Sequence, residues 1–125
     1  MLKFLISKSF LVLVLTAIIL PSNSLADIEA GKRALKDGDY DSATSEFRSS
    51  AEKGSAEGQF YLAESFFHGR GVLQDFSESI RWYEKSANQG YVQAQSMLGN
   101  MYYSGKYVNQ DFSKAALWFG KAGQS

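Results

Sequence analysis

The stretch GRGVLQDFS occupies residues 69–77, and the related stretch GKYVNQDFS occupies residues 105–113. The two stretches lie 36 residues apart, and the same step aligns further identical pairs. These pairs are Gln59 with Gln95, Leu62 with Leu98, Trp82 with Trp118 and Lys85 with Lys121. One step backwards places Asp39-Tyr40, Phe47, Ala51 and Gly54 under Asp75-Phe76, Tyr83, Ala87 and Gly90. A fixed period of this length is typical of stacked repeats, so the sequence predicts three units.

Each unit is predicted to contain two helices. Between Ala56 and His68 the apolar residues follow a helical rather than an alternating spacing. Gly69 is suited to the left-handed conformation that ends many helices. Asp75 is predicted to cap the next helix, which runs from Phe76 to about Asn88, with Glu78 completing a capping box. Trp82 and Trp118 are predicted to be core residues because the period fixes their positions.

Small residues recur at positions where helices must approach closely. Ala63 and Gly99 occupy one such position, and Ala43, Ser79 and Ala115 occupy another. This alternation of bulk and space is what stacked helical hairpins require. The predicted fold class is therefore all-α, a short α-solenoid of about three antiparallel helix pairs. The expected units are residues 27–54, 55–90 and 91–125.

The first 26 residues are predicted to be a signal peptide. Lys3 and Lys8 precede the apolar run FLVLVLTAIIL of residues 10–20, and Pro21 ends that run. Ser24 and Ala26 supply the small residues of a cleavage site, which we place after Ala26. The alternative, a retained membrane anchor, would need about 20 apolar residues. We therefore expect a periplasmic or secreted protein with no stable membrane insertion after cleavage.

Composition argues against several functions. The 125-residue chain has 13 basic and 13 acidic residues, and removal of Lys3 and Lys8 leaves a formal net charge of about −2. Nucleic-acid binding needs a concentrated basic face, so no nucleic-acid partner is expected. The chain has no cysteine and a single histidine, His68, so neither a metal site nor a catalytic triad is predicted. No cofactor and no enzymatic activity are expected.

The units resemble the Sel-one-like repeat (SLR), a variant of the tetratricopeptide repeat with a longer loop between its helices. The resemblance rests on Leu98-Gly99-Asn100-Met101-Tyr102, Gly105, Val108, Gln110-Asp111-Phe112, Ala115 and Trp118-Phe119, and on the loop of residues 69–76. It implies a right-handed solenoid that binds proteins. The first unit has a shorter loop, like an ordinary tetratricopeptide repeat. Tyr107 replaces the second loop glycine, which predicts a distorted turn in the third unit.

The resemblance also implies a concave groove lined by the first helix of each pair. The groove positions are Lys32 and Lys36, then Glu57, Phe60, Glu64, Phe67 and His68, and finally Gln93, Ser96, Asn100, Tyr103 and Ser104. Exposed aromatic residues on a rigid concave face are typical binding anchors. For Phe60 and Phe67 the alternative is that they pack against the first unit.

The expected function is an exported adaptor or scaffold that binds a peptide or a helix of an unidentified protein partner. A second hypothesis is an immunity protein that neutralises an exported toxin. A third, that of a β-lactam-binding or β-lactam-hydrolysing relative, is disfavoured because the chain lacks the cysteines of such relatives and any Ser-x-x-Lys sequence. Because the last predicted helix pair has no polar helix after it, self-association through this uncapped end is a further expectation.

Overall fold

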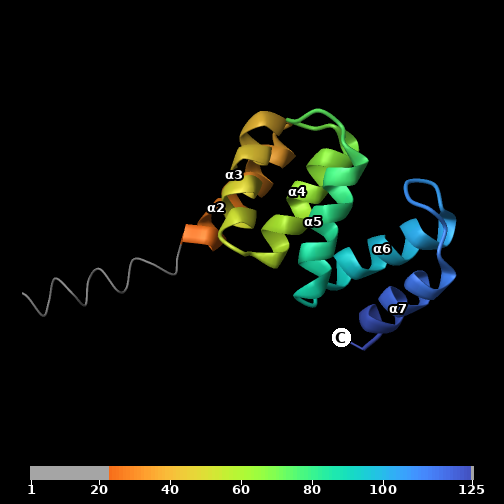
Figure 1. Ribbon diagram of the computed structural model, residues 1–125. Helices are drawn as coiled ribbons and strands as arrows, with labels where there is room; N and C mark the ends of the chain where they lie inside the picture. The colour runs from red at the N-terminus through yellow and green to blue at the C-terminus, as the bar shows by residue number, and fades with distance from the viewer. Residues whose placement is uncertain (1–22, 125) are drawn as a thin grey trace, which may run out of the picture.

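The protein is a row of three helical hairpins. The computed structural model describes residues 23–124, and within that range it contains six α-helices and no strand. The helices are α2 (Asn23–Lys36), α3 (Tyr40–Glu52), α4 (Ala56–His68), α5 (Phe76–Asn88), α6 (Val92–Ser104) and α7 (Phe112–Ala122). Figure 1 shows them following one another from orange to blue, each pair beside the next. The predicted all-α solenoid of helix pairs is confirmed.

Most of the predicted signal peptide, residues 1–22, lies outside the described range. Helix α2 begins at Asn23, four residues before Asp27, the predicted first residue of the mature chain. Within residues 23–124, no helix combines the length and the apolar character needed to cross a bilayer.

Polar side chains cap four of the helices, and one of them is the predicted Asp75. Each of these side chains accepts a hydrogen bond from the amide three residues further on, which satisfies a donor that the helix itself leaves free. The capping residues are Asp39, Ser55, Asp75 and Asp111. Helices α4 and α6 are followed by the C-cap residues Gly69 and Gly105, whose φ angles of 64° and 63° are left-handed.

The predicted capping box at the start of α5 is not formed. The amide of Asp75 donates to the carbonyl oxygen of Phe66 at 3.0 Å, because the loop folds back onto α4. Glu78 therefore has no amide to accept from, and its carboxylate pairs with Arg81 at 2.8 Å. The third unit repeats the loop bond, from the Asp111 amide to the carbonyl oxygen of Tyr102. Both caps thus consist of one aspartate side chain.

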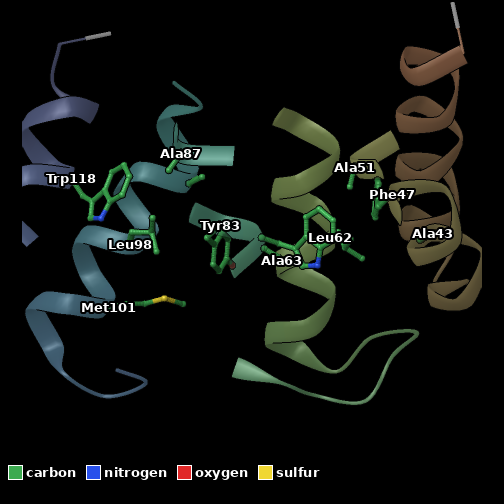
Figure 2. Packing of buried hydrophobic residues seen from close by; sticks show 12 residues of the cluster. Ala43, Phe47, Ala51, Leu62, Ala63, Tyr83, Ala87, Leu98, Met101 and Trp118 are labelled. Carbon is green, nitrogen blue, oxygen red and sulfur yellow. The ribbon is translucent and has the colours of Figure 1, made fainter. Parts of the chain in front are cut away.

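A single core runs through all three hairpins. Figure 2 shows its members passing from Phe47 through Leu62 and Tyr83 to Leu98 and Trp118. The small residues predicted at close helix contacts are all buried. One of them, Gly99, leaves no room for more atoms, and neither does Gly31, which was not predicted. A Cβ on Gly31 would lie 2.5 Å from the ring of Phe47, and one on Gly99 would lie 2.6 Å from the ring of Phe119. The packing of bulky rings on small residues is what holds each pair of helices together.

The two tryptophans are core residues, as predicted. Trp82 is 7% exposed and Trp118 is 8% exposed. A lysine three residues further along the same helix lies over the ring of each indole. Lys85 Nζ lies 4.3 Å from the Trp82 ring centroid, and Lys121 Nζ lies 4.7 Å from that of Trp118. The repeated lysine therefore has a repeated contact.

A candidate binding groove

The first helices of the three pairs carry the predicted groove residues, and a salt bridge links the first two of these helices. Lys32 Nζ of α2 lies 2.5 Å from Glu57 Oε1 of α4 and 5.6 Å from the centroid of the Tyr61 ring. The hydrogen bond to Glu57 raises the pKa of Lys32 above its ordinary value. Both side chains are about one-third exposed, so the pair stabilises the contact between α2 and α4 only modestly.

The middle residues of the predicted set are largely engaged by neighbouring side chains. Glu64 accepts a hydrogen bond from the Tyr83 hydroxyl, and His68 Nε2 lies 3.4 Å from its other oxygen. Burial, and then this carboxylate, raise the pKa of Tyr83 far above its usual range. Phe60 is half-buried, with its ring centroid 5.8 Å from that of Tyr83 and 5.2 Å from that of Tyr91. Phe60 therefore packs within and beyond its own unit.

A hollow between the second and third units brings together four of the predicted residues, Phe67, Asn100, Tyr103 and Ser104. Its volume is about 320 Å³. It is lined by Phe67, Met97, Asn100, Met101, Tyr103, Ser104 and Tyr107. Tyr103 lies at the edge of the hollow and is 61% exposed. Its ring makes a T-shaped contact with that of Phe112. Lys36 and Gln93 are exposed but lie outside this set.

Three lining residues, Met97, Met101 and Tyr107, were not assigned to the groove by the sequence analysis, and Tyr107 is the one that lies outside the helices. It comes from the loop between α6 and α7, and its ring centroid lies 4.9 Å from that of Phe67 and 4.6 Å from that of Phe76. Phe67 therefore packs toward the third unit and not against the first. The signal was present as the replacement of the loop glycine, but it predicted only a distorted turn. Every positive-φ residue in the described range is a glycine, so Tyr107 has an ordinary backbone.

A smaller cavity occupies the equivalent place between the first and second units. Its volume is about 80 Å³. Four of its lining residues correspond by the repeat to residues of the larger hollow. They are Leu35, Tyr61, Glu64 and Ser65, which correspond to Phe67, Met97, Asn100 and Met101. The repeat therefore places both sites at the same position between successive units, but different side chains line them.

The lining of the larger hollow favours binding over catalysis. Rings and thioethers form its walls, and the side chains of Asn100, Tyr103 and Ser104 offer hydrogen bonds at its rim. Among residues 23–124, no group of three or more His, Cys, Asp or Glu residues converges in a way that could hold a metal ion. Such a site is suited to an apolar side chain presented on a polar backbone.

Comparison with solved structures places this arrangement among related folds. A Sel1 repeat protein from Oxalobacter formigenes matches with 28% identity and a TM-score of 0.73, covering 82% of each chain. A protective antigen of uropathogenic Escherichia coli strains, which displays an SLR fold, matches with 28% identity and a TM-score of 0.75. That match covers 81% of this chain but only 22% of the antigen. No curated protein gives a significant match.

The sequence model of the Sel1 repeat matches residues 56–91 and 92–125, which is more than half of the chain. The first helix pair, α2 and α3, lies outside the matched ranges. The chain belongs to the Sel1 repeat family, whose repeats typically serve as protein-interaction scaffolds and not as catalysts.

Proposed function

We propose that this protein is an exported adaptor that binds a peptide or helix of a partner protein in the groove formed by α2, α4 and α6. The observation that carries the proposal is the hollow between Phe67 and Tyr103, which is large enough for one bulky apolar side chain. Tyr103 and Asn100 stand at its rim, where they can donate to and accept from a partner backbone.

The salt bridge between Lys32 and Glu57 and the hydrogen bond between Tyr83 and Glu64 support a rigid groove floor. A rigid floor lowers the entropy lost on binding, because fewer side chains must be ordered by the partner. We therefore propose that the partner binds over α6, at the open end of the groove. Helices α2 and α4 would form a rigid, preformed support.

Export is proposed because the residues up to Ala26 have the pattern of a signal peptide, and because the residues after Ala26 keep their contacts after cleavage. Cleavage there removes a contact from the Ser50 hydroxyl to the carbonyl oxygen of Ser24, and keeps those of Asp27. The Asp27 carboxylate accepts from Lys53 Nζ at 2.6 Å and from Ser49 Oγ at 3.0 Å, and Ile28 is buried. The protein recovered from the periplasm or the medium is expected to have an N-terminal sequence that begins at Asp27.

The groove is tested by capture from an envelope fraction with three forms of the purified protein. Tyr103→Ala removes the exposed ring at the rim, whereas Leu73→Ala removes an exposed side chain from the loop between α4 and α5. Leu73 is 91% exposed and serves as the matched control. We expect a protein that is retained by the wild type and by Leu73→Ala, and that is lost with Tyr103→Ala. Equal retention by all three forms would contradict binding in this groove.

A further inference from the structure

We propose that the outer face of α7 is a second docking surface, which binds an α-helix of another protein. The helix it accepts has the residue pattern that α4 and α6 use when they pack on the preceding unit. This proposal concerns a surface outside the groove and does not depend on it.

One aromatic position distinguishes α7 from the two helices equivalent to it. The repeat places Phe47 in α3, Tyr83 in α5 and Phe119 in α7 at the same position. Phe47 is 1% exposed and Tyr83 is 0% exposed, whereas Phe119 is 40% exposed. The ring of Phe47 is covered by Tyr61 of the unit that follows it, and the ring of Tyr83 lies in the continuous core. Phe119 rests on Gly99 of its own unit and presents its other side outward.

The first junction shows how such a ring is covered. Tyr61 of α4 stacks on Phe47 with ring centroids 4.7 Å apart and an interplanar angle of 15°. One turn earlier, Gly58 brings the α4 backbone against α3. A Cβ on Gly58 would lie 2.5 Å from Ser50 Oγ and 2.8 Å from the Ala51 nitrogen. A small residue followed three positions later by a flat side chain is therefore the pattern that fits this face.

The second junction uses a related pattern on α6. Ala94 corresponds to Gly58, and Met97 corresponds to Tyr61. Ala94 is 0% exposed, and Met97 packs against the core cluster. A thioether therefore stands where the first junction has an aromatic ring, and methionine adapts to flat apolar surfaces.

Helix α7 presents the counterpart of these receiving surfaces. Ala122 and Gly123 correspond to Ser50 and Ala51, so they leave room for close approach of a backbone. A Cβ added to Gly120 would meet nothing within 4 Å. Phe112, which is 59% exposed and equivalent to Phe76, adds apolar surface on the same helix. Bulky residues beside a track of small ones are the shape into which a helix packs.

A second copy of the chain does not supply the matching helix at its other end. On α2 the residues equivalent to Gly58, Tyr61 and Ser65 are Ala26, Glu29 and Arg33. All three are exposed. Stacking α2 of one copy on α7 of another would bury the Glu29 carboxylate against the Phe119 ring, which is unfavourable. The occupant that we propose is a helix of a different protein, with an aromatic residue or methionine at the central position.

The probe for the test is a synthetic peptide of residues 55–68, the sequence of α4. A hydrocarbon staple replaces the side chains of residues 60 and 64, which leaves Gly58, Tyr61 and Ser65 free to dock. The staple is needed because an isolated helix of this length is marginal in water. Binding to the purified full chain is measured by titration calorimetry.

The decisive variant is Gly123→Arg, at the position equivalent to Ala51, where Gly58 brings the α4 backbone closest to α3. A Cβ on Gly123 meets only carbonyl oxygens of α7 itself, at 3.5 and 3.8 Å, and its φ of −76° suits any residue, so the fold is retained. Asn88→Arg places the same charge on exposed α5 and is the control. We expect saturable peptide binding to the wild type, to Asn88→Arg and to Tyr103→Ala, and loss of binding to Gly123→Arg. A peptide with Tyr61→Ala should not bind.

Three results would overturn the proposal. The first is failure of the peptide to bind the wild type. The second is equal binding by Gly123→Arg, since the peptide would then be displacing the protein's own α4. The third is a wild-type dimer that Gly123→Arg converts to monomer in light scattering, which would make this face an interface between copies.

Discussion

The two junctions between successive units are built at equivalent positions but from different materials. At the first junction, Thr44 Oγ1 donates to the carbonyl oxygen of Arg70 at 2.8 Å and lies 3.1 Å from Ser65 Oγ. At the second, Ile80, Met101 and Lys106 stand in place of those residues. There the Tyr107 ring fills the space between Phe67 and Phe76.

The loops follow the same division. Gly71 has a φ of 70°, and a Cβ on it would lie 2.2 Å from the carbonyl oxygen of Tyr40. The second loop has Tyr107 at that place, with its ring held against aromatic neighbours. Where the backbone of Gly71 lies against Tyr40, the cavity has a volume of about 80 Å³. Where the Tyr107 ring separates the units, the hollow has a volume of about 320 Å³. The replacement of a loop glycine, as by Tyr107 here, can therefore create a candidate binding site.

The largest expected effect comes from giving the first junction the residue of the second. Gly71→Tyr forces a side chain into the carbonyl of Tyr40 and into a left-handed backbone conformation. We expect a loss of stability of about 3 kcal/mol, measured by urea unfolding. If the variant unfolds at the wild-type urea concentration, the first loop is not held in this contact.

The reverse exchange should cost less. Tyr107→Gly removes two aromatic contacts and adds backbone freedom at a residue that does not need positive φ. We expect a loss of about 2 kcal/mol in the same unfolding measurement. The hollow should also lose one wall, so a partner captured through Tyr103 should bind more weakly. Unchanged stability would mean that Tyr107 does not bridge the second and third units.

A smaller effect is expected from the hydrogen bond at the first junction. Thr44→Val keeps the shape of a side chain that is 3% exposed but leaves the Arg70 carbonyl oxygen without its donor. We expect a loss of about 1 kcal/mol. Ile80→Val at the equivalent site trims one methylene group, and its comparison with Thr44→Val separates lost bonding from lost packing. Equal losses would argue against a polar first junction.

The smallest effect depends on pH. Because the pKa of Lys32 is raised in the folded state, its salt bridge to Glu57 stabilises the fold fully below pH 10.5, the ordinary lysine value. That stabilisation is lost as pH rises through the higher folded-state pKa. Lys32→Met should therefore lower stability by about 0.5 kcal/mol at neutral pH, and the difference should fade in strongly alkaline solution. Gln93→Ala, at the position equivalent to Glu57, should have no such dependence.

The fold could be predicted because a repeat gives the same information more than once. The period placed α4 at Ala56–His68 and α5 at Phe76–Asn88, and both bounds agree with the structure. Burial of Trp82 and Trp118 followed from the same register. The capping box failed because the sequence pattern gave no sign that the Asp75 amide already donates to Phe66 across the loop.

The candidate site was less predictable for a related reason. Groove positions assigned by resemblance include Phe67, Asn100 and Tyr103, which do meet in the hollow. Glu64 and Phe60 were also assigned, although their partners Tyr83 and Tyr91 could only be known from tertiary contacts. Tyr107 was missed because a residue that differs from the repeat pattern was interpreted only as a distortion of the turn. Such differences are where one member of a family acquires a surface of its own.

The placement of the two indoles makes the molecule its own spectroscopic reporter. Trp82 and Trp118 are the only tryptophans, and they occupy equivalent, similarly buried positions in the second and third hairpins, each beside a lysine. Their emission therefore records those two hairpins in nearly the same environment and is silent about the first. Two proteins that each keep one indole would show whether a short array melts as one body or frays from an end.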